Sequence, residues 1–188
     1  MYKDNLKGKF VTLKRISQDD CANLQKLAMS EDIWEFMLFN CSTEAEFIKW
    51  FNTLLDKNKK DEICTFIIKS NINQNLIGTI SLKNYSENNS KIEVGTLWIG
   101  KEYWGKLPEL KRETSCKLIN YCFEDLSVNK IEFRVDHKNI KSQNLIKNIG
   151  AKLDGNLRED VKINGVFSDS LVFSILKRDW TKLKLSKY

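Results

Sequence analysis

The sequence predicts a mixed α/β (α+β) domain, in which about four helices flank a mostly antiparallel, twisted sheet of about seven strands. Apolar residues repeat at every second position in some stretches and at helical spacing in others, and the two kinds of stretch interchange along the chain. No stretch rich in Pro or Ser divides the 188 residues. We therefore expect a single domain over residues 1–188.

Two helices and four strands are expected in the first half of the chain. Residues 17–30 and 41–60 carry apolar residues at helical spacing. Ser42 or Thr43 suits the N-cap of the second helix, and Glu46 is placed for a capping box. Alternation and turn residues predict strands at 9–16, 62–69, 75–84 and 91–100.

The second half adds a helix, a strand, another helix and a hairpin. Pro108 suits the first turn of a long amphipathic helix. An alternating strand at 130–137 precedes a helix that Asn139 caps and Gly150 ends. Asn-Gly lies between two β runs within 161–178, which is the strongest short signal for a hairpin.

Composition restricts the function classes. The net charge is +6, but the lysines are spread along the chain, which favours a solvated surface over a nucleic-acid interface. Five cysteines without a CxxC pair and a single histidine predict reduced thiols and no metal site. The N-terminus lacks the apolar segment of a signal peptide, and no apolar run approaches the roughly 20 residues that span a bilayer. We expect a cytoplasmic protein without a membrane partner.

Several short phrases follow one another in a specific order and spacing. They include LIGTISL at 76–82, IEVGTLWI at 92–99, YWGK at 103–106, the N-x-x-S of Asn139 and Ser142, and IGAKLDG at 149–155. Together they resemble the GCN5-related N-acetyltransferases (GNAT), most closely the branch of the ribosomal-protein N-terminal acetyltransferases. The resemblance implies an acyltransferase that moves the acetyl group of acetyl-CoA, its cosubstrate, to a primary amine by direct attack and without a metal.

The resemblance also implies where the cosubstrate binds. The strand at 92–99 would diverge from the strand at 130–137 and admit the acyl-pantetheine chain between them. Main-chain groups near the end of the first strand, the loop that follows it and the N-x-x-S pair would contact acetyl-CoA. These positions are Leu97, Trp98, Ile99, Trp104, Gly105, Lys106, Leu107, Asn139 and Ser142.

Glu93 lies where many relatives carry a carboxylate that draws the proton of the amine through water. The period of a strand would place it beside Leu97, and a solvent-facing structural glutamate is the alternative. Glu159 and Asp160 lie where some relatives keep another acid, so either is a substitute base. Ser142 would protonate the leaving thiolate, since a hydroxyl both donates and accepts; ordinary bonding in a first helical turn is the alternative.

The acceptor is expected to be a protein or peptide N-terminus or a small amine. Trp34 and Phe39 are candidate walls of its groove, although aromatic residues at helical spacing more often belong to a core. Asp169, after the hairpin glycine, would order the floor of the site or meet the amine. Homodimer formation is left open.

The loop at 105–109 departs from the family pattern. Relatives usually carry Gly-x-Gly, whereas this chain has Gly105, Lys106 and Leu107 before Pro108. Leucine adopts a positive φ only at a cost, and proline lacks an N–H donor. The alternative is therefore a catalytically weak or inactive binding module that keeps the fold.

Overall fold

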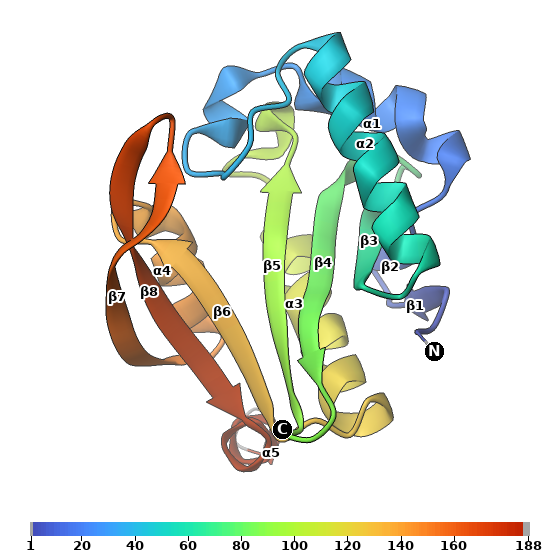
Figure 1. Ribbon diagram of the computed structural model, residues 1–188. Coiled ribbons are helices and arrows are strands. Elements are labelled where there is room, and N and C mark those ends of the chain that lie inside the picture. Colours follow the sequence, from blue (N-terminus) through green and yellow to red (C-terminus); the bar gives the residue numbers. More distant parts are fainter. Residues whose placement is uncertain (1, 186–188) are drawn as a thin grey trace.

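The computed structural model describes residues 2–185, so residues 1 and 186–188 of the predicted domain lie outside the described part. One twisted sheet runs through the molecule, with helices against both of its faces (Figure 1). This architecture confirms the predicted fold class, with eight strands in the described residues where about seven were expected.

The eight strands lie in the order β1-β2-β3-β4-β5-β6-β8-β7. Every neighbouring pair is antiparallel except β5 with β6, which run parallel. The strands are β1 (Asn5–Lys7), β2 (Val11–Arg15), β3 (Ile63–Ser70), β4 (Leu76–Ser86), β5 (Lys91–Ile99), β6 (Lys130–Asp136), β7 (Lys152–Ile163) and β8 (Val166–Leu176).

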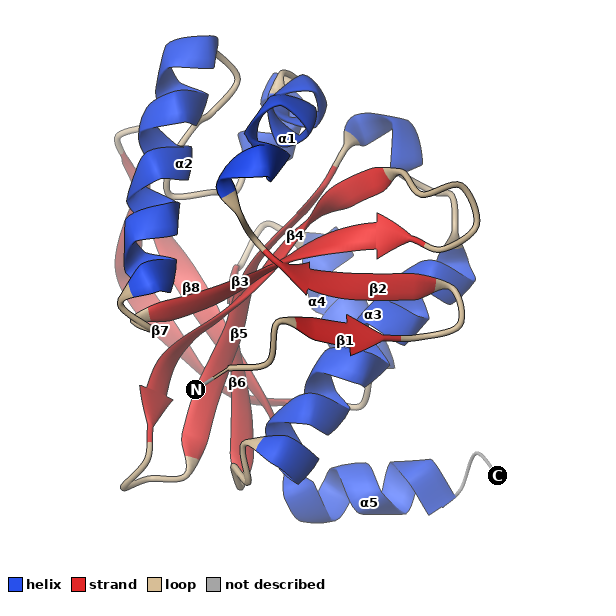
Figure 2. Ribbon diagram, turned by 90° about the vertical axis from the view of Figure 1, so that its right-hand side faces the viewer, coloured by secondary structure: helices blue, strands red, loops and turns tan. Residues whose placement is uncertain are grey.

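The helices form two layers, one on each face of the sheet (Figure 2). One layer holds α1 (Cys21–Ala28) and α2 (Glu44–Lys59), and the other holds α3 (Pro108–Asn120) and α4 (Ile140–Asn148). A π-helical turn, Tyr121–Asp125, continues α3. The last helix, α5 (Lys177–Leu185), lies at the end of the sheet near the start of β6 (Figure 1).

Local sequence chemistry sets several boundaries as predicted. Thr43 accepts a hydrogen bond from the Glu46 main-chain N–H, so Thr43 rather than Ser42 is the N-cap of α2. Pro108 opens α3, and the Asn139 side chain caps α4. The hairpin between β7 and β8 turns at Asn-Gly, with both residues at positive φ.

Other boundaries differ from the sequence expectation. The strand expected at 9–16 is only part of a hairpin, because a short β1 precedes it and the chain turns near Gly8. Strand β7 begins at Lys152, well before the expected hairpin, and α5 was not expected. Trp180 of α5 is buried and donates to Asn120 Oδ1 at 2.8 Å, so the helix packs onto the end of α3.

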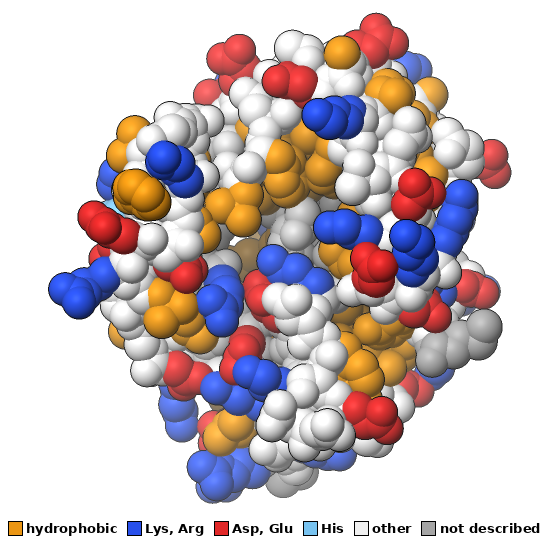
Figure 3. Space-filling model, viewed as in Figure 1, with side chains coloured by type: hydrophobic (Ala, Val, Ile, Leu, Met, Phe, Trp, Pro, Cys, Tyr) orange, Lys and Arg blue, Asp and Glu red, His pale blue; other side chains and the backbone are white. Residues whose placement is uncertain are grey.

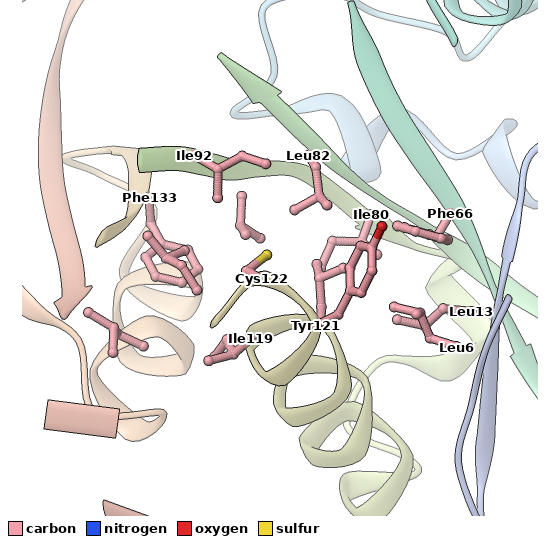
Figure 4. Packing of buried hydrophobic residues seen from close by; sticks show 14 of the residues in the cluster. Leu6, Leu13, Phe66, Ile80, Leu82, Ile92, Ile119, Tyr121, Cys122 and Phe133 are labelled. Atoms are coloured by element: carbon pink, nitrogen blue, oxygen red, sulfur yellow. The ribbon is translucent and has the colours of Figure 1, made fainter. Parts of the chain in front are cut away.

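Two apolar clusters hold the layers together. The larger lies between the sheet and the α3 side, and Figure 4 shows Leu13, Phe66, Ile80, Ile119, Cys122 and Phe133 among its members. The smaller lies under α1 and α2 and includes Leu24, Trp34, Phe47, Phe51, Ile67 and Trp98. The sheet needs an apolar cluster on each side because its central strands are buried on both faces.

One carboxylate ties α3 to the first hairpin. Glu113 accepts three main-chain hydrogen bonds, from Lys9 at 2.7 Å, Phe10 at 2.6 Å and Val11 at 2.9 Å. A Cβ atom at Gly8 would lie 2.5 Å from the Glu113 carboxyl carbon, so a larger residue there would displace the carboxylate. This contact fixes α3 relative to the edge of the sheet.

Removal of the Glu113 carboxylate should loosen this connection. We expect Glu113→Ala to lower the free energy of unfolding by roughly 1–3 kcal/mol, because three N–H groups lose a charged acceptor. Urea unfolding followed by circular dichroism measures the loss. Glu109→Ala, which removes an exposed acid from the same helix, is the control, with an expected change below about 1 kcal/mol. Equal losses in the two variants would contradict the role of Glu113.

Candidate functional site

The parallel strands β5 and β6 pair only at their beginnings. Their register includes Lys91 with Lys130, Ile92 with Ile131 and Glu93 with Glu132, and no later pair is present in these strands. Beyond this point the strands diverge, as Figure 1 shows. Figure 3 shows the molecular surface hollowed over this region, with hydrophobic, basic and acidic side chains around the hollow.

A cavity of about 140 Å³ lies where the strands diverge. Its wall on β5 runs from Val94 to Leu97, and its wall on β6 from Phe133 to Asp136. Side chains of α3 and α4 close one side, and the segment before α2 contributes Phe36 and Met37. The cavity is therefore a cleft through the sheet with different surroundings on its two faces.

A β-bulge in β5 shapes the cleft. Thr79 of β4 pairs with Trp98 and Ser81 with Gly95, so β5 has one residue more than β4 over this interval. Thr96 within the bulge has φ of 49°, a left-handed conformation. The extra residue shifts the alternation of side chains, so Leu97 packs against the larger cluster while Trp98 joins the smaller one. The expectation that Glu93 lies beside Leu97 is wrong for this reason.

Glu93 is buried, with 3% of its surface exposed, and is held by several donors. Lys83 Nζ lies 3.0 Å from Oε1, and Asn84 Nδ2 donates to Oε2 at 2.8 Å. Arg134 of β6 lies 3.8 Å from Oε2 and reaches Asp160 at the same distance. The carboxylate thus joins β4, β5 and β6 on the face opposite α3, where one amide and two cationic side chains surround it.

Asn139 and Ser142 both line the cleft. The Asn139 side chain accepts the Ser142 main-chain N–H at 3.0 Å, which fixes the first turn of α4. The Ser142 hydroxyl has no hydrogen-bond partner among residues 2–185 and is half-buried at the cavity wall. It is placed to meet a group inside the cleft.

The loop from Trp104 to Leu107 lies before α3 and does not line the cavity. Trp104 Nε1 donates to the Ile99 carbonyl at 2.9 Å, and Lys141 of α4 lies 5.1 Å from the Trp104 ring centroid. Leu107 caps α3 with φ of 56°, so leucine occupies the kind of left-handed position that favours glycine. This conformation costs roughly 1 kcal/mol in a non-glycine residue.

Lys111 lies on the face of α3 that leads to the cleft. It precedes Ser115 and Leu118, both cavity-lining, by four and seven residues, the spacing of one helix face. Burial lowers the pKa of Lys111. It forms no ion pair with any of residues 2–185, so its charge is partly desolvated without a partner.

The candidate groove residues Trp34 and Phe39 lie outside the cavity. Trp34 is 2% exposed, and its ring centroid lies 5.6 Å from Phe39 and 5.4 Å from Trp98. Both residues belong to a cluster of aromatic rings under α2. Phe36 and Met37, between them in sequence, reach the cavity instead.

Asp169 orders the β7–β8 hairpin. It accepts the Glu159 main-chain N–H at 2.9 Å and the Asn156 side chain at 3.0 Å, and these two bonds lower the pKa of its carboxyl. Glu159 is exposed with φ of 50°, in an irregular stretch of β7. Neither acid lines the cavity.

Arg134 and Asp136 line the cleft but were not among the residues that the sequence singled out. Along β6 they alternate with Phe133 and Val135, and these two apolar side chains pack into the larger cluster. Arg134 and Asp136 therefore face the opposite side of the sheet. This alternation was the one signal available in the sequence. Within residues 2–185, no group of three or more His, Cys, Asp or Glu side chains could hold a metal ion.

An ionic cluster surrounds the point from which the strands diverge. Glu132 lies 3.3 Å from Lys91 and 3.2 Å from Lys130, and Lys130 also reaches Asp154 at 2.8 Å. Burial of Glu132 opposes its ionisation, but the two lysines outweigh burial and lower its carboxyl pKa. The hydrogen bond from Lys130 lowers the pKa of Asp154.

Comparison with known proteins places this geometry among acetyltransferases. The family model described as acetyltransferase (GNAT) domain matches residues 11–152. YdaF of Bacillus subtilis (strain 168), named as a candidate ribosomal N-acetyltransferase, is 37% identical over 105 residues, which are 56% of this chain and 56% of YdaF. The uncharacterized N-acetyltransferase p20 of Bacillus licheniformis is 26% identical over 174 residues, 90% of this chain and 94% of p20.

A solved structure shows the same fold. Spermidine N-acetyltransferase from Vibrio cholerae, in complex with CoA and spermine, superposes with a TM-score of 0.78 at 21% identity, covering 93% of this chain and 99% of that one. None of the helices within residues 2–185 has both the length and the apolar character that a membrane crossing requires.

Acid should weaken the ionic cluster at the divergence point. Folding lowers the pKa values of Glu132 and Asp154. Their contribution to the free energy of unfolding is therefore complete above pH 4.5, and it is lost as the pH falls through the lowered pKa values. We expect Glu132→Gln to destabilise the protein by about 1 kcal/mol at pH 7 and much less at pH 3.

Thermal unfolding at the two pH values measures this difference. Glu87→Gln, at an exposed turn, is the control and should change little at either pH. A destabilisation by Glu132→Gln that persists undiminished at pH 3 would show that the charge of Glu132 is not its source.

Proposed function

Because the chain belongs to the acetyltransferase (GNAT) family, we propose that it transfers the acetyl group of acetyl-CoA to a primary amine by direct attack. The observation that carries this proposal is the cleft between β5 and β6, which opens after three paired rungs. A long, narrow thioester fits a cleft bounded by main chain on two sides. Acetyl-CoA would then enter the cleft from one face of the sheet, and the amine would approach from the other.

The donor is proposed to enter from the side of α3 and α4. Unpaired main-chain groups of β5 near the bulge, at Thr96 and Leu97, are available to the pantetheine amides and the thioester carbonyl. The diphosphate would lie against the first turn of α3, where free N–H groups and the helix dipole favour an anion. Lys106 and Lys111 add positive charge there.

The acetyl transfer needs a neutral amine, a polarised carbonyl and a protonated leaving group. The cleft would supply orientation, which alone accounts for much of a rate enhancement in such reactions. Ser142 is proposed to donate its hydroxyl proton to the departing thiolate, because its oxygen lies at the cavity wall. The ammonium nitrogen loses two protons overall: a carboxylate on the acceptor face takes the first, and the second replaces the proton that Ser142 gives to the thiolate.

The acceptor is proposed to approach the opposite face, past Phe36 and Met37. An α-amino group has a pKa near 7.7–8.0 and deprotonates more easily than an alkyl amine near 10.4. This chemistry favours a protein or peptide N-terminus. The name of YdaF mentions a ribosomal acceptor, and a polyamine, the substrate named for the Vibrio cholerae enzyme, is the competing acceptor. Five free cysteines suit the reducing conditions of the cytoplasm, the proposed compartment.

A second candidate is an acetyltransferase fold that binds without catalysing. The left-handed Leu107 and the donor-less Pro108 at the start of α3 support it, since they remove two of the features that hold a diphosphate closely. Calorimetric titration with acetyl-CoA distinguishes the candidates when combined with an assay of transfer.

Transfer is tested with an alanine-rich peptide bearing a free N-terminus, with the same peptide N-acetylated as the control, and with spermidine. We expect CoA release and an N-acetyl product, detected by mass spectrometry, with the free peptide and none with the blocked peptide. Donor binding without any product would support the inactive module. Absence of acetyl-CoA binding at millimolar concentration would contradict the enzyme and leave the inactive module as the better account.

Lys111 provides a separate test of donor placement. We expect Lys111→Ala to weaken acetyl-CoA binding about tenfold, because a partly desolvated charge loses its contact with phosphate. Calorimetry measures the dissociation constant. Arg112→Ala, which removes an exposed cation from the next position of α3, is the control and should change affinity less than about twofold. Equal effects would indicate general electrostatic attraction rather than a contact at Lys111.

A further inference from the structure

Asp136 presents a buried carboxylate to the cleft. It lies at the end of β6, 4% of its side chain is exposed, and it lines the cavity. Oδ1 accepts the Lys138 main-chain N–H at 2.8 Å, and Oδ2 accepts the Ser168 hydroxyl at 2.5 Å. Each oxygen retains a further lone pair, so the carboxylate can accept another hydrogen bond from inside the cleft.

A hydrogen-bonded chain orients this carboxylate. Ser168 Oγ lies 3.2 Å from His137 Nδ1, and the His137 side chain is 40% exposed. Since the Ser168 hydroxyl donates its hydrogen to Asp136, the Ser168 oxygen is free to accept a hydrogen bond from Nδ1–H of His137. The order is then imidazole N–H to hydroxyl, and hydroxyl to carboxylate, which requires the neutral ring to carry its proton on Nδ1.

Asp136 and Glu93 differ in what surrounds them. Lys83 and Asn84 occupy the oxygens of Glu93 at 3.0 and 2.8 Å. Around Asp136, the one ion-pair partner within 4.0 Å among residues 2–185 is the His137 imidazole, which carries a charge only when it is protonated. The Lys83 ammonium already occupies the place beside Glu93 that an acceptor ammonium would take, whereas no lysine or arginine lies within ion-pair distance of Asp136 among residues 2–185.

We propose that Asp136 is the general base of acetyl transfer, with Ser168 and His137 as positioning residues that hold its carboxylate toward the acceptor. This assignment rests on the proposed function. The N–H bond of the ammonium breaks, its electron pair stays on nitrogen, and the proton passes to Asp136, directly or through one water. The neutral amine attacks the thioester carbonyl, the C–S bond breaks, the departing thiolate takes the Ser142 proton, and the second proton of the nitrogen replaces it on Ser142. Asp136 returns its own proton to water after the product leaves.

The orientation of the chain is tested without any substrate. His137 is the only histidine of the chain, so the imidazole signals in a nitrogen-15 NMR spectrum need no assignment by mutation. We expect the neutral ring of the wild type to carry its proton on Nδ1, and the Nε2-protonated form to predominate in Ser168→Ala. A wild-type ring protonated on Nε2 would overturn the positioning role of Ser168 and His137.

The base is tested by turnover with the free alanine-rich peptide and with spermidine. We expect Asp136→Asn to lower kcat about 100-fold with acetyl-CoA affinity unchanged, since the donor binds from the other face. Ser168→Ala should lower kcat about tenfold, because the carboxylate remains but loses its orientation. Ser170→Ala, a buried serine of the same strand without a side-chain hydrogen bond among residues 2–185, is the control and should act within twofold of the wild type.

The outcomes separate this proposal from the proposed function. If the wild type acetylates either amine and Asp136→Asn retains its kcat, the base is another group and the acetyltransferase assignment stands. If the wild type acetylates neither amine, the proposed function fails and the base has no reaction to serve. Unchanged acetyl-CoA binding by Asp136→Asn in calorimetry shows that the variant is folded, so a loss of kcat then supports the proposal.

Discussion

The parallel pairing of β5 with β6 stops after three rungs, and the arrangement of the candidate site depends on that limit. The ionic cluster around Glu132 and the donors around Glu93 hold the strands together at the last rungs. Beyond them, the main chains separate and α4 packs beside the gap. A cleft through a sheet gives two chemically different approaches to one point, which is what a group transfer between two substrates requires.

Divergence has a cost that the molecule offsets elsewhere. Main-chain groups of β5 and β6 lose ladder partners, and the bulge places Thr96 at a positive φ. Unpaired main-chain groups beside a cavity are destabilising in an empty protein and useful to a ligand that carries amides. Glu113 offsets part of this cost at a distance, because its three hydrogen bonds fix α3 to the first hairpin.

Much of the fold follows from local chemistry that the sequence displays. The Asn-Gly turn, Pro108 and the Asn139 cap were predicted because each depends on only a few neighbouring residues. Strand β7 was missed over its first part because it is exposed almost throughout and shows no alternation. The bulge at Thr96 was missed because only pairing with β4 reveals it. Asp136 was missed because Ser168, which orients it, lies 32 residues away.

A crystal structure with bound acetyl-CoA tests the central claim most directly. The account predicts an acyl-pantetheine chain between Val94–Leu97 of β5 and Phe133–Asp136 of β6, with the diphosphate against the first turn of α3 and near Lys111. The thioester would then lie within reach of Ser142 from one side and Asp136 from the other. Acetyl-CoA bound elsewhere, or strands β5 and β6 paired along their whole length in solution, would contradict it.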